Sequence, residues 1–226
     1  MSVPIITVDG PGGAGKGTLS YSLASQLGWG MLDSGALYRV TAFAALKADI
    51  PLTDEAAISD IASHLALEFV PAAEGLTQVL LNGQDISVAI RSESCSATAS
   101  KVAAMGDVRA ALLERQRRMA VAPGLVADGR DMGTVVFPDA PLKVFLTASA
   151  EARADRRYRQ LLAKGESVTL ARLLETIEER DARDRNRTES PLVPATDALV
   201  IDSTGISADS VLDTVLREAR LRQLVS

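Results

Sequence analysis

The chain has 226 residues, a formal net charge of -5, one cysteine and one histidine. Its length suits one globular body with room for a small inserted subdomain, and its acidic balance argues against a sequence-independent grip on nucleic acid. Cys95 alone cannot form an internal disulfide, and one cysteine with one histidine argues against a zinc site. Because neither a secretory leader nor a long apolar run is present, we expect a cytoplasmic protein that binds no membrane.

The first elements predict the opening of a βαβ unit. Residues 3–8 are a β-branched run typical of a buried strand, and glycines separate them from a helical stretch over 16–27. A second helix is predicted over 34–46, with Ser34 as its candidate N-cap, and a third over 54–65.

The pattern then changes to short strand-like pieces at 67–70, 78–81 and 85–86. Gly75 and the pair Asn82-Gly83 separate them, and Asn-Gly is a strong signal for a hairpin turn. This block predicts a small antiparallel insertion.

Alternating strands and helices occupy the remainder of the chain. The apolar pieces at 125–127, 143–146 and 199–201 predict strands, and helical patterns fill the segments between and beyond them: 92–103, 107–121, 150–163, 169–185 and 207–224. This alternation predicts an α/β fold, in which helices cover both faces of a parallel sheet.

A phosphate-binding loop follows the first strand. The run Asp9-Gly10-Pro11-Gly12-Gly13-Ala14-Gly15-Lys16-Gly17-Thr18 contains G-x-x-x-x-G-K. Its glycines let backbone N–H groups converge on an anion, and the next helix adds the positive end of its dipole. We therefore predict that this run from Gly10 onward binds the triphosphate of ATP, with Lys16 reaching the transferred phosphate.

Gly17 occupies the position where a serine or threonine usually ligates magnesium, and Thr18 follows it. G-K-G-T resembles the loop of nucleoside-monophosphate kinases, in which Mg²⁺ is held mainly through water and the nucleotide phosphates. Asp128 ends a short apolar strand, so it is the candidate to orient those waters; the alternative is a turn-capping aspartate. The missing hydroxyl argues against a GTPase switch.

Three later segments resemble bacterial-type cytidylate kinases. They are Leu32-Asp33-Ser34-Gly35-Ala36-Leu37-Tyr38-Arg39, then Asp128-Gly129-Arg130-Asp131-Met132-Gly133-Thr134, then Glu179-Arg180-Asp181 with Arg183-Asp184-Arg185-Asn186-Arg187. The resemblance covers nearly the whole chain, and its one departure in the loop is Gly12, where a serine is expected. It implies transfer of the γ-phosphoryl group of ATP to CMP or dCMP in pyrimidine metabolism, with Mg²⁺.

The resemblance also implies roles for regions and residues. The core of a single kinase unit would be 1–33, 104–149 and 166–226, the monophosphate-binding region 34–103 and the lid 150–165. The catalytic residues would be Lys16, Arg130, Arg156, Arg157 and Arg180. The CMP-binding residues would be Ser34, Tyr38, Arg39, Ser100, Arg109, Arg130, Asp131, Arg180, Asp184 and Arg187.

Residue chemistry agrees with this reading of the acceptor site. Asp131 can accept a hydrogen bond from the cytosine amine, Arg109 can donate to the acceptor edge of the base, and several arginines suit phosphoryl transfer between polyanions. Arg180, Asp184 and Arg187 would share one helix face at spacings of four and three, where a salt-bridge ladder is the alternative.

Other functions stay open from sequence alone. A UMP or AMP kinase is the nearest alternative, followed by a regulatory GTP switch and a nucleotide-binding scaffold without catalysis. No heptad pattern or exposed apolar seam stands out, so we expect a monomer.

Overall fold

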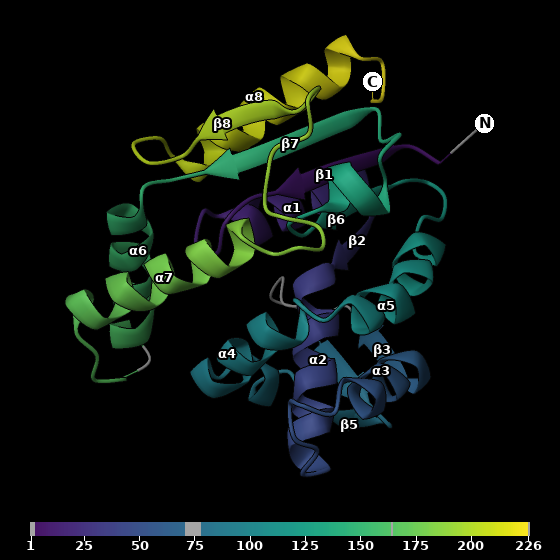
Figure 1. Cartoon of the computed structure of the whole chain (residues 1–226). Helices are drawn as coiled ribbons and strands as arrows, with labels where there is room; N and C mark the ends of the chain where they lie inside the picture. The colour runs from purple at the N-terminus through teal and green to yellow at the C-terminus, as the bar shows by residue number, and fades with distance from the viewer. Residues whose placement is uncertain (1–2, 71–77, 164, 226) are drawn as a thin grey trace. The chain divides into compact units, whose positions relative to one another are not determined.

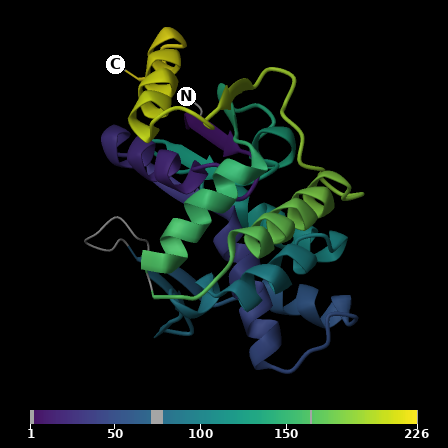
Figure 2. The ribbon, with the colours of Figure 1, turned by 90° about the vertical axis from the view of Figure 1, so that its left-hand side faces the viewer.

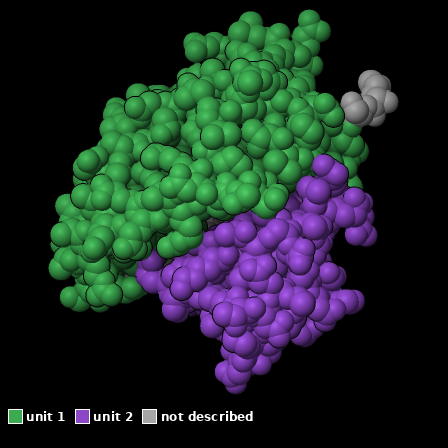
Figure 3. All heavy atoms as spheres, viewed as in Figure 1, with its two compact units in different colours: residues 1–32, 119–226 green, residues 33–118 purple. Residues whose placement is uncertain are grey.

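The computed structural model describes residues 3–70, 78–163 and 165–225. They form two compact units, residues 1–32 with 119–226 and residues 33–118 (Figure 3). Our sequence assignment placed 104–149 in the kinase core, whereas helix α5 (Gly106–Arg118) lies in the second unit. The functional roles given to the regions remain predictions.

The first unit contains a five-stranded sheet in the order β2-β6-β1-β7-β8 (Figure 1). Its strands are β1 (Ile5–Asp9), β2 (Gly30–Asp33), β6 (Leu125–Asp128), β7 (Leu142–Thr147) and β8 (Leu199–Asp202). β1 pairs in parallel with β6 and β7, and β7 pairs in parallel with β8. The predicted parallel sheet is confirmed; β2 was not predicted, because four residues beginning with glycine carry little strand signal.

Helices α1 (Lys16–Leu27) and α8 (Ala208–Leu221) lie side by side against one face of this sheet (Figure 2). Ile6 and Val8 of β1 are fully buried in the core that these two helices form with the sheet. Thr7 alternates to the opposite face, where a π-helix (Met132–Val136) lies so close that a Cβ on Gly133 would be 2.9 Å from Thr7 Oγ1. Helical elements therefore cover both faces of the sheet.

Helices α6 (Ala150–Ala163) and α7 (Leu170–Arg185) lie beside each other (Figure 2). They pack through a small core of Ala154, Leu161 and Leu173. Thr169 begins α7, because its side chain accepts a hydrogen bond from the backbone N–H of Arg172.

The second unit combines helices with an antiparallel sheet of β3 (Leu67–Val70), β4 (Gln78–Leu81) and β5 (Gln84–Asp85). The predicted hairpin is confirmed: Leu81 pairs with Gln84, and Asn82 and Gly83 have φ of 51° and 75°, the left-handed values of a tight hairpin turn. Gly75, the other predicted breaker, lies outside the described residues.

The helices of this unit are α2 (Ser34–Lys47), α3 (Glu55–His64), a 3₁₀ turn (Ala89–Arg91), α4 (Glu93–Val102) and α5. The prediction that Ser34 caps α2 is wrong. Asp33 is the N-cap, and its carboxylate accepts the backbone N–H of Ala36 at 2.9 Å. A carboxylate one residue earlier also interacts with the helix dipole, which a serine hydroxyl does only weakly.

Candidate active site

The loop between β1 and α1 has a backbone that only glycine can supply. Gly10 has φ of 144°, and a Cβ there would be 1.9 Å from the carbonyl oxygen of Leu146. Gly13 and Gly15 have φ of 82° and 99°, also in the left-handed region. The chain then enters α1 at Lys16, so the N–H groups of the loop and the first helical turn converge at one point, as anion binding requires.

Lys16 lies under this loop, with 8% of its surface exposed and its Nζ donating to the carbonyl of Pro11 at 3.0 Å. Burial lowers the pKa of Lys16 to about 8; the charges of Arg130 and Arg180 lower it further, and Asp128 and Asp9 oppose the shift. Burial therefore disfavours the charged amine of Lys16 more than any neighbouring charge does, and an anionic ligand beside it would favour the protonated form.

Two arginines from distant segments flank the loop. A Cβ on Gly12 would be 3.5 Å from Nη2 of Arg130 and 3.7 Å from Nη1 of Arg180. Arg130 Nε donates to Oδ2 of Asp184, a carboxylate that is 2% exposed. Burial raises the pKa of Asp184, but the charges of Arg130 and Arg180 outweigh it and hold this pKa below its ordinary value. Asp184 is therefore ionised and fixes the guanidinium of Arg130.

Arg187 completes this group, with Nε donating to the backbone carbonyl of Asp184 at 3.4 Å. The structure therefore brings together Lys16, Arg130, Arg180, Asp184 and Arg187, all within the first unit. Their shared face on α7 was predicted, but Arg187 itself lies just beyond the helix, which ends at Arg185.

Two aspartates are the last residues of the neighbouring strands β1 and β6. Asp128 Oδ2 lies 3.7 Å from a Cβ built on Gly17, at the N-terminus of α1. Asp9 accepts the backbone N–H groups of Met132 and Gly133 at 2.8 Å each, and burial raises its pKa to about 7. Asp9 thereby ties the loop to the segment that carries Arg130 and Asp131, a role that the sequence analysis missed.

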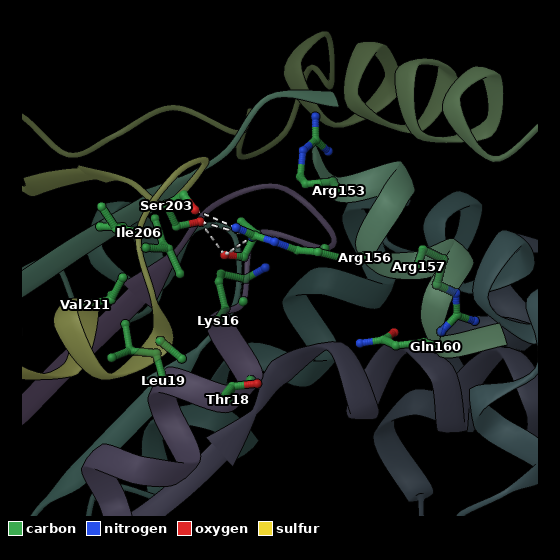
Figure 4. Close-up of a pocket in the computed structure, with 16 residues that line it drawn as sticks. Lys16, Thr18, Leu19, Arg153, Arg156, Arg157, Gln160, Ser203, Ile206 and Val211 are labelled. Atoms are coloured by element: carbon green, nitrogen blue, oxygen red, sulfur yellow. Dashed lines mark hydrogen bonds between the residues drawn. The ribbon is translucent and has the colours of Figure 1, made fainter. Parts of the chain in front are cut away.

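A cavity of about 450 Å³ opens beside Lys16 and Thr18 (Figure 4). Leu19, Ile206 and Val211 form an apolar side, while Arg157 and Gln160 of α6 lie on another (Figure 4). Such a mixture of apolar wall and cationic mouth suits a nucleotide with a flat base and an anionic tail.

Arg156 is held at the mouth of this cavity. Its Nη1 donates to Oγ of Ser203 at 3.2 Å and to the carbonyl of Ala14 at 3.4 Å (Figure 4). Ser203 and Ile206 were not predicted. They follow β8, and a signal did exist, since ligands of parallel sheets bind at the carboxyl ends of the strands.

In the second unit, Arg39 pairs with Asp33 at 2.7 Å, and the guanidinium of Arg109 lies 5.8 Å from the centroid of the Tyr38 ring. Ser34 Oγ donates to Oε1 of the buried Gln116 at 2.7 Å. Ser100 is 5% exposed. These side chains lie on α2, α4 and α5, and their contacts with CMP remain predictions.

The fold and loop define a P-loop nucleotide-binding protein, with an arginine-rich cluster beside the loop of the kind that phosphoryl transfer requires.

A model of the cytidylate kinase family matches residues 6–221. The chain is 59% identical over 213 residues to a cytidylate kinase of Shewanella loihica, covering 94% of this chain and 93% of that protein. It is 57% identical over 223 residues to one of Stutzerimonas stutzeri (98% and 97% covered) and 54% identical over 225 residues to one of Klebsiella pneumoniae (100% and 99% covered). The chain belongs to the cytidylate kinase family.

In the parts of the chain that the structure describes, no helix is long and apolar enough to cross a membrane.

Proposed function

We propose that the chain transfers the γ-phosphoryl group of ATP to CMP or dCMP and releases ADP with the nucleoside diphosphate. The observation that carries the proposal is the convergence of Arg130 and Arg180 on Gly12 of the phosphate loop, whose Lys16 lies within the field of both guanidinium groups, in a member of the cytidylate kinase family.

Phosphoryl transfer needs positioning and charge stabilisation more than covalent chemistry. The loop and Lys16 would hold the β- and γ-phosphates, and the apolar side of the cavity would cover the base. Arg130 and Arg180, which lie beside Gly12, would stabilise the negative charge that increases as the phosphoryl group leaves ADP. The acceptor phosphate carries its own nucleophilic oxygen, so no general base is required.

Mg²⁺ fits this proposal through Asp128. Its carboxylate oxygen lies beside Gly17 at the N-terminus of α1, where oxygen ligands can hold the waters that magnesium keeps. Among the described residues, no three histidine, cysteine or carboxylate side chains gather as a dedicated metal site. Bound with ATP, the ion would neutralise phosphate charge.

We further infer that residues 150–165 act as a lid and residues 34–103 as the monophosphate-binding region. Arg156 and Arg157 lie on α6 and line the cavity, so a movement of α6 would change their distance from bound phosphates.

The test is a coupled assay of ADP release with magnesium-ATP against CMP, dCMP, UMP and AMP. We expect CMP and dCMP to be preferred, and turnover to fall by at least about 100-fold in Lys16→Ala, as when a preorganised charge is removed. Lys47→Ala is the matched control and should retain activity, because Lys47 is an exposed lysine whose Nζ donates to Oε1 of Gln84 at 3.4 Å.

Asp131→Ala tests base recognition separately. Asp131 is 3% exposed, and it would accept the cytosine amine, so its removal should lower CMP turnover sharply and reduce the preference for CMP over UMP. Preference of the native chain for AMP or UMP would overturn the cytosine assignment. No turnover with any monophosphate would favour the switch or scaffold interpretation.

A further inference from the structure

Arg153, in the first turn of α6, is 2% exposed and joins three separate segments. Its Nη1 donates to Oδ1 of Asp181 at 3.0 Å, and its Nη2 donates to Oδ2 of the same carboxylate. Nη1 also donates to the carbonyl of Gly12 at 3.1 Å, and Nε donates to the carbonyl of Ala148 at 3.0 Å. One guanidinium thus fastens the phosphate loop, the end of β7 and helix α7 to one another.

The backbone of the loop lies directly on this side chain. A Cβ on Gly13 would be 3.2 Å from Cβ and 3.5 Å from Cγ of Arg153. The position of Arg153 therefore sets where Gly12 and Gly13 can lie, through packing as well as through the hydrogen bond to Gly12.

Helix α7 carries a second carboxylate with the same kind of task. Asp184, three residues after Asp181, holds Arg130, and Arg180 precedes Asp181 directly. Asp181 is 5% exposed and Asp184 2% exposed. Because the two aspartates are three apart on one helix, fixing Asp181 against Arg153 also fixes Arg180 and Asp184 relative to Gly12.

We propose that Arg153 is a positioning residue for phosphoryl transfer, which acts by holding the phosphate loop and the Arg180–Asp184 face of α7 at a fixed distance. This inference rests on the proposed function for its kinetic readout. Arg153 lines the same cavity as Arg156 and Arg157, but its guanidinium is bound to Asp181 and to the carbonyls of Gly12 and Ala148, and in this scheme it touches no reacting atom. These contacts anchor the first turn of α6, so the movement proposed for the lid would involve the part of α6 that follows Arg153.

Arginine is required for this task. Its planar fork can meet both oxygens of Asp181 and still reach two carbonyls, whereas a lysine ammonium is a compact point charge with three donors. Arg153→Lys keeps the charge and most of the volume but cannot make all four contacts. Asp181→Asn keeps the shape but loses the charge and one acceptor.

We would measure the affinity for ADP by calorimetry, kcat and KM with CMP, and urea unfolding for Arg153→Lys, Asp181→Asn and the double variant. We expect each single variant to lower kcat on the order of 10- to 100-fold, because small misplacements of phosphate-binding groups are costly, and to weaken ADP binding. The double variant should be no worse than the poorer single variant, since the two side chains act as one unit.

The control is the exposed pair of Arg159 with Asp155 on the same helix, at 2.6 Å. Arg159→Lys and Asp155→Asn make the same chemical changes outside the network and should leave kcat and ADP affinity unchanged.

A purely structural role would lower the unfolding midpoint but leave the folded variants active. The proposal is overturned if folded Arg153→Lys keeps kcat and ADP affinity within about twofold of the native chain, which is the usual scatter of uncoupled sites. If Arg153→Lys does not fold, the same criterion applies to folded Asp181→Asn. The ADP affinity can be measured without any acceptor nucleotide. If the native chain prefers another monophosphate, the proposed function is therefore contradicted, but the ADP affinities of the variants still test the role of Arg153.

Discussion

The backbone of the phosphate loop limits which side chains its positions can carry, because Gly10, Gly13 and Gly15 all have positive φ. Lys16 and Asp128 were predicted from the loop motif and from a strand that ends in an acid. The contacts that Asp9 makes with Met132 and Arg153 makes with Gly12 were not predicted, because each hydrogen bond joins positions more than 100 residues apart and leaves no local pattern.

Gly10→Ala should destabilise the chain far more than Gly28→Ala. Both positions have positive φ, so both substitutions introduce backbone strain of about 1–3 kcal/mol. At Gly10 the new Cβ would also be 1.9 Å from the carbonyl oxygen of Leu146, whereas at Gly28 nothing lies within 4 Å. We expect Gly10→Ala to cost at least about 2 kcal/mol more, on the scale of overpacking, as measured by urea unfolding.

Equal costs for the two variants would mean that the strands at Gly10 and Leu146 separate easily, contrary to the parallel register of β1 with β7.

At the scale of elements, the sequence predicts most helices and strands because their signals are local. α1, α6, β3 and β4 begin and end where the glycine, apolar and capping patterns place them. The π-helix Met132–Val136 was missed, because it depends on Asp9 accepting the N–H groups of Met132 and Gly133 from another strand.

Thr169→Ala should weaken α7 at its first turn. The Thr169 hydroxyl accepts the backbone N–H of Arg172, and loss of an N-cap costs about 1 kcal/mol in the free energy of unfolding. Thr176→Ala is the control in the same helix. Its hydroxyl only donates back to the carbonyl of Arg172, so alanine should be neutral or slightly stabilising there. Chemical unfolding of both variants checks this; a larger loss for Thr176→Ala would contradict it.

At the scale of the whole molecule, the free energy of unfolding should depend on pH through the titration of Asp9. Burial, with help from the charge of Asp131, raises the pKa of Asp9 to about 7, although the N–H groups of Gly133 and Met132 and the charge of Lys16 oppose the shift. The folded chain therefore binds this proton more tightly than the unfolded chain. Asp9 contributes stability that is fully present below about pH 4 and is lost as the pH rises to 7.

Asp9→Asn removes this titration. Measured by urea unfolding from pH 5 to 8, the stability of the native chain relative to Asp9→Asn should fall by up to about 1.4 kcal/mol per pH unit below pH 7 and then level off. A difference that does not change with pH would show that Asp9 titrates alike in the folded and unfolded chains.

The depressed pKa of Lys16 has a consequence for its reactivity as an amine. With a pKa of about 8, about a tenth of the Lys16 side chains are uncharged and nucleophilic at pH 7, whereas an ordinary lysine amine is almost entirely protonated. Lys16 is 8% exposed but lines the cavity, so an amine-reactive acylating or aldehyde reagent small enough to enter should modify it. A bound nucleotide would protect Lys16 in two ways, because it would cover the amine and favour its protonated form. The rate at which Lys16 is modified would therefore report whether a nucleotide occupies the phosphate loop.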